Sequence, residues 1–262
     1  MDDYEIRRNI WEGKIPVEFD FDTREFTSIR SPQSYFAMLP RISYFPLCLS
    51  KALKFLSINV DEDIDVKDVW LEYNGQILKW HYPIGLLYDM YVADGTLPWV
   101  INVRSQNYPN ELVHPSKDTM RHIFLQAVKE ADQLKHKGQV ISSMTKDEHN
   151  RLFDSVANNK FDDFWSVNKR LMYDETNKIS YVPIRFYEPG SPFKQVLISP
   201  SNEDDSPCIL ESAIRKALPT IDFSSYTVIS QGINVPLNTS VIWMARNLSY
   251  PDNFIHILLR KS

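Results

Sequence analysis

Apolar residues follow the same plan in two stretches of the chain, residues 70–104 and 226–260. Each stretch begins with a run of β-branched and aromatic residues that a glycine turn interrupts, at Asn74-Gly75 in one and at Gln231-Gly232 in the other. An Asn-Gly pair readily adopts the positive φ of a tight turn, and both runs predict a β-hairpin. A short apolar helix and a closing strand of alternating apolar residues follow in each. The repeated order predicts one fold used twice.

The pattern continues upstream of each hairpin. Residues 14–22 and 181–189 predict first strands, while residues 47–56 and 208–218 carry apolar residues at helical spacing. Both halves therefore read strand, strand, long helix, hairpin, short helix, strand. That is the order of the ubiquitin-like β-grasp, an α+β fold in which a mixed sheet packs one face on a helix.

The ends of the second long helix are marked in the sequence. Ser206 is placed as its N-cap, Pro207 at its first helical position, and Pro219 stops it.

Residues 117–173 differ in kind, with one glycine, no proline and apolar residues at three- and four-residue spacing, which predicts a helical region. The first helix should run from Ser116 or Lys117 to about Lys137, with Gly138 ending or bending it. Thr145 and Glu148 form a capping box that starts the next helix. The third should bury a stripe of mainly aromatic residues in the core: Phe161, Phe164, Trp165, Asn168 and Leu171.

Lys129 lies on the first of these helices, whose apolar face carries Ile123, Phe124, Ala127, Ala131 and Leu134. At about 100° per residue, Lys129 points roughly 180° from the centre of that face, so its amine should be in water. Lys135 and Lys137 are nearby and look like ordinary surface lysines.

Composition and charge argue against several classes of protein. The 262 residues are 43% hydrophobic, which suits a globular protein. No apolar run is long enough to span a membrane and the start has no signal-peptide pattern, so we expect a cytosolic protein. Two cysteines, Cys48 and Cys208, exclude a disulfide framework. A net charge of −5 argues against a dedicated nucleic-acid binder but leaves room for weak contact with an anionic membrane.

No catalytic constellation stands out. His81 and Asp89 have no serine or cysteine nucleophile at a recognisable spacing, and Cys48 is expected to be buried on an apolar helix face. The histidines are scattered, with no metal-binding motif, and the seven glycines are too isolated to form a phosphate-binding loop. We therefore expect no metal, no cofactor and no enzymatic activity of the chain alone.

The chain resembles the autophagy protein 5 family. The matching strings span nearly the whole chain in the family's order: Ile10–Pro16, Leu39–Tyr44, Lys79–Leu87, Lys129–Asp132, Phe161–Trp165 and Leu248–Phe254. The resemblance implies an N-terminal helix (1–13), a first ubiquitin-like domain (14–106), a helix-rich domain (117–174) and a second ubiquitin-like domain (179–262).

The resemblance also implies a function. Lys129, by motif match, would be the acceptor of an isopeptide bond from the C-terminal glycine of the ubiquitin-like autophagy protein 12, delivered by the conjugating enzyme autophagy protein 10. The conjugate, held by a helix of autophagy protein 16 in a groove, would act as a non-catalytic part of an E3-like complex. Through autophagy protein 3 it would promote attachment of autophagy protein 8 to phosphatidylethanolamine, peripherally at the preautophagosomal structure and the isolation membrane.

The residues are consistent with an acceptor. A solvent-facing helix position makes the Lys129 amine reachable, and neither predicted domain ends in Gly-Gly, so the chain should receive a modifier instead of being one. The alternative is a non-conjugated cytosolic adaptor whose two β-grasp domains bind peptides or membranes.

Overall fold

The fold comes from a computed structural model in which residues 3–22, 25, 33–60, 64–172 and 179–261 are described. The described chain forms two compact units. Residues 13–122 make the first unit, and residues 1–12 together with 123–262 make the second unit. The expected domain limits at residues 1, 174 and 262 lie outside the described residues.

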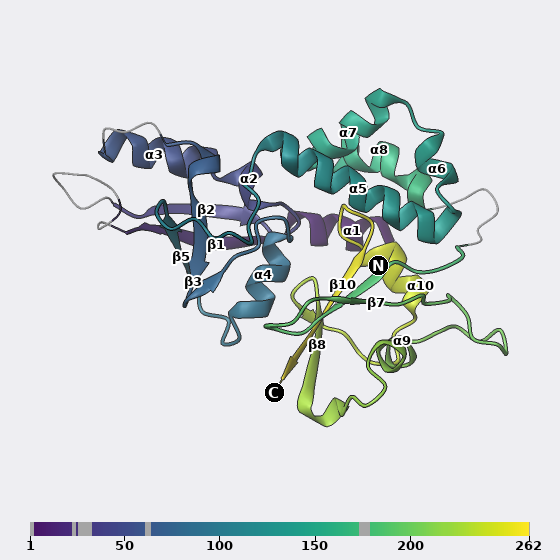
Figure 1. The fold of residues 1–262 in the computed structure, drawn as a ribbon. Helices are drawn as coiled ribbons and strands as arrows, with labels where there is room; N and C mark the ends of the chain where they lie inside the picture. Colours follow the sequence, from purple (N-terminus) through teal and green to yellow (C-terminus); the bar gives the residue numbers. More distant parts are fainter. Residues whose placement is uncertain (1–2, 23–24, 26–32, 61–63, 173–178, 262) are drawn as a thin grey trace. The chain divides into compact units, whose positions relative to one another are not determined.

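The unit formed by residues 13–122 is built on a five-stranded mixed sheet in the order β2-β1-β5-β3-β4 (Figure 1). The central pair β1 and β5 is parallel, and the other neighbours are antiparallel. The strands are β1 (Lys14–Phe21), β2 (Tyr35–Pro40), β3 (Trp70–Tyr73), β4 (Gln76–Ile77) and β5 (Trp99–Arg104). Along β1 the side chains alternate between the core and the outer face, as a strand with one buried face requires.

The helices of this unit lie against the inner face of the sheet, where Phe45 contacts Phe19 and Trp99. They are α2 (Phe45–Cys48), α3 (Ser50–Val60), the 3₁₀ turn η1 (Val66–Asp68) and α4 (Ile84–Tyr91). The single helix predicted over 47–56 is therefore two pieces. Pro46 is accommodated in the first turn of α2, where a missing backbone N–H costs nothing.

The second sheet, formed by residues 184–261, repeats the first, in the order β7-β6-β10-β8-β9. Again the central pair, β6 and β10, is parallel. The elements are β6 (Ile184–Tyr187), β7 (Lys194–Gln195), α9 (Leu210–Ala217), the 3₁₀ turn η2 (Phe223–Ser225), β8 (Tyr226–Ser230), β9 (Ile233–Asn234), α10 (Val241–Asn247) and β10 (Ile255–Lys261). The two ubiquitin-like β-grasp folds predicted from the duplicated pattern are confirmed.

Both predicted hairpin turns are confirmed. Asn74 and Gly75 have φ values of 48° and 77°, and Gln231 and Gly232 have 53° and 78°. Two successive positive φ values give a tight turn whose twist matches that of the flanking strands.

The predicted start of α9 is wrong. The helix begins at Leu210, its N-cap position is Ile209, and no side chain caps it. Ser206 instead bonds to Asp204 and Asn202 within the preceding loop, and Pro207 pairs with Ser201 in an isolated β-bridge. The local turn competes successfully for the serine hydroxyl.

The helices that lie between the two sheets in the sequence are α5 (Lys117–His136), α6 (Gln139–Ser142), α7 (Lys146–Ala157) and α8 (Phe161–Met172). They appear together in teal in Figure 1. The capping box of Thr145 and Glu148 is present, and Gly138, at φ 76°, follows the end of α5. The N-terminal helix α1 (Asp3–Glu12) packs on this unit, with Trp11 against Phe161 and Phe164 at ring-centroid distances of 5.7 Å and 5.0 Å.

Candidate functional site

Helix α5 carries Lys129 as an exposed residue. Among the described residues its amine makes no hydrogen bond and no ion pair. Val128 and Ala131, on either side of it in the sequence, are both fully buried. The helix is therefore fixed by its neighbours while the amine itself is available to another molecule.

The buried face of α5 is rotated from the one predicted. Phe124 and Ala131 are buried as predicted, whereas Ile123, Ala127 and Leu134 are only partly buried. The other buried residues of the helix are Met120, Val128, Asp132, Lys135 and His136. At about 100° per residue the centre of the observed face lies roughly 115° from Lys129 and not opposite it. Lys129 consequently lies at the edge of the packed surface, although it is exposed as expected.

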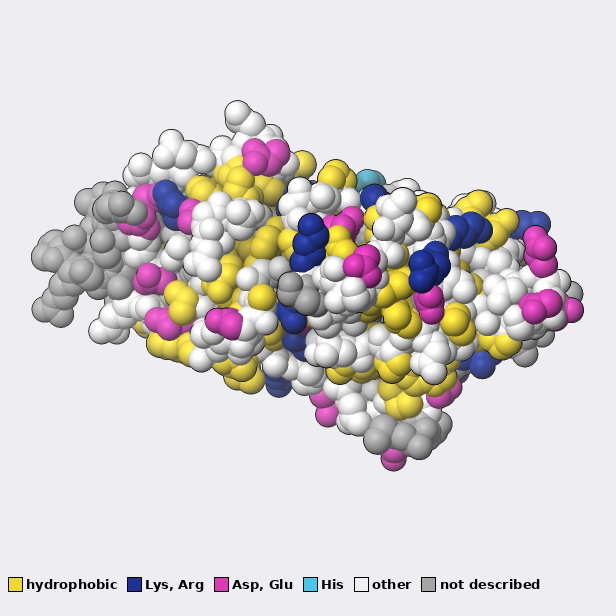
Figure 2. Space-filling view, turned by 90° about the horizontal axis from the view of Figure 1, so that it is seen from below, with side chains coloured by type: hydrophobic (Ala, Val, Ile, Leu, Met, Phe, Trp, Pro, Cys, Tyr) yellow, Lys and Arg dark blue, Asp and Glu magenta, His cyan; other side chains and the backbone are white. Residues whose placement is uncertain are grey.

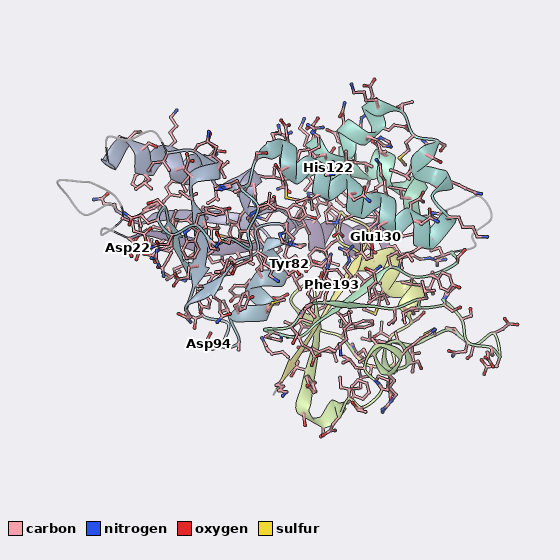
Figure 3. The ribbon with its side chains drawn as sticks, in the orientation of Figure 1. Asp22, Tyr82, Asp94, His122, Glu130 and Phe193 are labelled. Atoms are coloured by element: carbon pink, nitrogen blue, oxygen red, sulfur yellow. The ribbon has the colours of Figure 1, made fainter. Side chains whose placement is uncertain are left out.

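Glu130 lies on another side of the helix and ties α5 to the second sheet. Its carboxylate accepts a hydrogen bond from Arg185 Nη2 on β6 at 2.9 Å and one from Gln195 Nε2 on β7 at 3.0 Å. Arg185 in turn lies over the ring of Phe254 at 3.7 Å. In Figure 3, Glu130 lies on the side of α5 that faces this sheet. The residue next to Lys129 is thus anchored by two donors from two strands.

Asp132 anchors the following part of the helix. Its Oδ1 lies 2.8 Å from Nδ1 of His136, and its Oδ2 accepts from the backbone N–H of Ile141 at 2.9 Å. Of the string Lys129-Glu130-Ala131-Asp132, one side chain is packed and the two acidic side chains are hydrogen-bonded. Only the lysine projects freely.

Lys135 is not an ordinary surface lysine, and that expectation is wrong. It is 1% exposed, and its Nζ donates to Oδ1 of Asn253 at 2.8 Å and to the carbonyl of Leu171 at 3.2 Å. Burial lowers the pKa of Lys135 to about 7, although Asp132 and Asp252 act in the opposite direction. Lys137, in contrast, is exposed and lies past the helix end at φ 56°.

A buried polar network connects this lysine to the strand that closes the second sheet. Asn253 Nδ2 donates to Oδ1 of Asn168 on α8 at 2.8 Å. Next to it, Oδ2 of Asp252 lies 2.9 Å from Nε2 of His256, whose Nδ1 lies 2.8 Å from the Tyr187 hydroxyl. Burial pushes the pKa of Asp252 up, but His256 and Arg185 bring it below its ordinary value. The helices and the second sheet are therefore joined by hydrogen bonds whose members are buried.

Sequence reasoning missed these anchors because it counts charged residues as surface. Lys135 and His136 do follow the spacing of the buried face, since they lie three and four residues after Asp132. Leu248–Phe254 was singled out by resemblance, and it contains both Asp252 and Asn253. The sequence signal for their burial is that these polar residues continue the spacing of the apolar stripe.

His81, Asp89 and Cys48, which lack the spacing of a catalytic motif, lie in the unit formed by residues 13–122. Both oxygens of Asp89 lie 2.6 Å from the guanidinium of Arg41, and His81 contacts the rings of Trp80 and Tyr82. Burial raises the pKa of the Cys48 thiol, which disfavours a reactive thiolate. Among the described residues no cluster of three or more His, Cys, Asp or Glu side chains could hold a metal ion.

Hollows on the described surface of the second unit include the following pair. One, of about 820 Å³, lies between α9 and the loop before it, and includes Glu203, Asp204 and Lys216. The other, of about 420 Å³, lies between α1 and the start of α8, and includes Arg8, Lys160 and Asp163. Lys129 lines neither of them. Both combine acidic and basic side chains, which gives no preference for one sign of ligand charge.

Surface charge is mixed. On the face drawn in Figure 2, acidic and basic side chains are interspersed between hydrophobic ones. None of the described helices combines the length and apolar character that a membrane span needs.

Comparison with known proteins identifies the family. Three family models match in succession: "Autophagy protein ATG5, UblA domain" over residues 10–105, its alpha-helical bundle region over 117–174, and its UblB domain over 181–259. Autophagy protein 5 of Drosophila melanogaster is 35% identical, over 97% of this chain and 96% of that protein. Autophagy-related protein 5 of Caenorhabditis elegans is 36% identical, over 98% of each.

A solved structure has the same fold. The crystal structure of Kluyveromyces marxianus Atg5 superposes with a TM-score of 0.85 over 98% of this chain and 99% of that one, at 19% identity. The chain therefore belongs to the autophagy protein 5 family, and its role is in autophagy.

Proposed function

We propose that this chain is the acceptor subunit of an autophagy conjugation complex, with Lys129 forming an isopeptide bond to the C-terminal glycine of autophagy protein 12. The observation that carries the proposal is the state of the Lys129 amine. It is exposed and has no partner among the described residues, on a helix that is anchored at Glu130 and Asp132.

The chemistry needed from this chain is small. The amine attacks the carbonyl carbon of a thioester held by autophagy protein 10, the C–N bond forms, and the cysteine thiolate leaves while the amine loses a proton. The conjugating enzyme supplies the activated carbonyl, so the acceptor has only to present a reachable amine. The buried Lys135 cannot reach such a thioester.

In the proposed complex the chain is non-catalytic. A helix of autophagy protein 16 binds it, and the assembly stimulates transfer of autophagy protein 8 from autophagy protein 3 to phosphatidylethanolamine. It acts from the cytoplasm, at the periphery of the preautophagosomal structure and the isolation membrane. The paired β-grasp folds serve as surfaces for protein contacts, which is the role that a scaffold requires.

The test is Lys129→Arg in a conjugation reaction reconstituted from purified components. Arginine keeps the charge and the approximate length but is a poor nucleophile, so the conjugate should disappear while the fold is unchanged. Lys137→Arg is the matched control, because Lys137 is also exposed and belongs to the same segment. It should be conjugated at the normal rate.

Intact mass and peptide mapping give the answer. Undiminished conjugation of Lys129→Arg, or transfer of the modifier to Lys137, would remove Lys129 from its role. A wild-type chain that stays unmodified in cells with active autophagy would favour the non-conjugated adaptor.

A further inference from the structure

The sheet of the first unit has one edge that is unlike the other sheet edges of the described chain. The edge strands β4, β7 and β9 have two residues each, whereas β2 has six. The sequence of β2 is YFAMLP, with no charged residue and with proline only at its end. Soluble proteins normally shorten, charge or cover an edge strand, since its free backbone groups can pair with another chain.

The side chains beside this edge form an apolar patch. Phe36 and Met38 are 63% and 58% exposed, and Val100 on β5 is 43% exposed. Pairing places them on one face, because Phe36 and Val100 are both register partners of Glu18, and Met38 is the partner of Pro16. We call these residues, Pro16, Glu18, Phe36, Met38 and Val100, the β2 patch.

Glu18 is the one charged residue of the β2 patch. Its side chain is half-buried and makes no ion pair or hydrogen bond among the described residues. A ligand that covered the patch with apolar groups alone would strip water from this carboxylate without replacement, which is costly. The ligand that fits therefore carries a basic side chain between apolar ones.

The free edge decides the form of that ligand. β2 pairs only with β1, so the backbone N–H and C=O groups of Phe36 and Met38 point away from the sheet and have no partner among the described residues. Pro40 has no N–H, and its C=O accepts from the backbone N–H of Ser43. A helix has already used its own backbone groups and cannot satisfy them, whereas an extended segment can.

We propose that β2 binds an extended peptide segment of a partner protein as a sixth strand of the first sheet. The segment has alternating apolar residues, which lie beside Phe36 and Met38, and one lysine or arginine, which pairs with Glu18. This site is separate from the acceptor amine and does not depend on the proposed conjugation.

The probe is a fluorescently labelled peptide with blocked ends and the sequence Thr-Ile-Thr-Arg-Thr-Ile-Thr. Its binding to the full chain is measured by fluorescence anisotropy. Met38→Lys should weaken binding by at least about tenfold, because it charges the edge. Ile233→Lys is the matched control, since Ile233 is 52% exposed on the short edge strand β9. It should bind the probe as the wild type does.

Charge reversal tests the role of Glu18. Glu18→Lys should weaken the arginine peptide by about tenfold and strengthen a peptide with glutamate in that place. Loss of binding to both peptides, or no change for either, would overturn the assignment of Glu18.

Backbone pairing has its own test. Two peptides are compared, one N-methylated at the odd residues and the other at the even residues. The peptide whose methyl groups point away from β2 should bind normally, and the peptide whose methyl groups face β2 should not bind. Amides of β2 should also gain protection from hydrogen exchange when the unmodified peptide binds. Equal binding of both methylated peptides, or absence of binding by the unmodified one, would overturn the proposal. So would a dimer of the chain in sedimentation that Met38→Lys dissociates, because the edge would then pair with its own copy.

Discussion

Two lysines on α5, six positions apart, have opposite environments. Lys135 is buried among Asn253, Leu171 and Met172, and its pKa of about 7 leaves a large neutral fraction at physiological pH. Lys129 is in water. A thioester delivered by another protein can meet only the exposed amine, so access and not basicity would select the acceptor in the proposed reaction.

The buried Lys135 should make folding depend on pH. Its pKa is about 7 when folded and has the ordinary value of 10.5 when unfolded, so between these values only the unfolded chain holds the proton. The free energy of unfolding should therefore rise with pH in this window, by at most about 1.4 kcal/mol per pH unit. Lys135→Met should lose this rise, as measured by urea unfolding at pH 7, 8 and 9.

Lys137→Met is the control, because that residue is exposed and should keep the wild-type slope against pH. The comparison uses the slope of the unfolding free energy against pH. A loss of stability that is the same at every pH, such as that from the unpaired Asn253 oxygen, therefore does not affect it. An unchanged slope in Lys135→Met would show that the amine stays protonated in the folded chain.

Sequence patterns predict the conformation of a residue where its cause is local, and fail where partners distant in the sequence determine its position. The turn at Asn74-Gly75 was predictable because the positive φ is a property of those two residues. The sequence pattern predicts Ser206 as a helix cap, but Asp204 and Asn202 hold its hydroxyl in a loop. The same patterns place Lys135 on the surface, and its burial depends on Asn253, which lies more than a hundred residues later.

Among the elements, β10 has the most demanding position. It is the central strand of its sheet, parallel to β6 and antiparallel to β8. Ile255, Ile257 and Leu259 face the core with α9 and α10, while Phe254, His256 and Leu258 are buried on the other side. The sequence predicted a strand here, but not that both of its faces are covered, since alternation normally indicates one wet face.

Ile257→Ala should lower the free energy of unfolding of the second unit by about 2–5 kcal/mol, because it leaves a cavity in a close-packed core. Ile233→Ala is its matched control and should change stability by less than about 0.5 kcal/mol, since that side chain is 52% exposed. Chemical denaturation measures both. Equal effects of the two variants would contradict the central placement of β10.

Truncation after Tyr250 is the stronger form of this prediction. It removes β10 entirely and leaves β6 and β8 without the strand that lies between them. The truncated chain should aggregate or show collapsed amide signals for residues 180–250 in an NMR spectrum. A folded product would mean that the second sheet does not need its central strand.

At the scale of the whole molecule, one unit is made from separate parts of the chain. Helix α1 belongs with residues 123–262, although residues 13–122 intervene. Trp11, 4% exposed, fixes it to Phe161 and Phe164 of α8. The duplicated hairpins predicted both sheets, but nothing in residues 1–13 indicated which unit the first helix joins, because an apolar face does not specify its partner.

Trp11→Ala should therefore loosen the second unit and spare the first. Removing a buried tryptophan costs about 3–5 kcal/mol. Hydrogen exchange read by mass spectrometry should quicken in α1 and α8 and stay the same in β1 and β5. If exchange in the first sheet quickened to the same extent, the assignment of α1 to the second unit would be wrong.

The discontinuous unit has a consequence for synthesis on the ribosome. Helix α1 emerges before residues 13–122, and these residues can close their own sheet as soon as β5 is out, since none of their strands comes later. The second sheet cannot close until β10 has left the exit tunnel, although α5 and its lysines appeared long before. Throughout that interval Lys135 has no Asn253 to bond to, and both lysines are open to solvent. Of Lys129 and Lys135, a nascent chain would thus expose both and the finished protein only Lys129. The modification proposed at Lys129 would therefore be selective between these two lysines only after synthesis has passed Asn253.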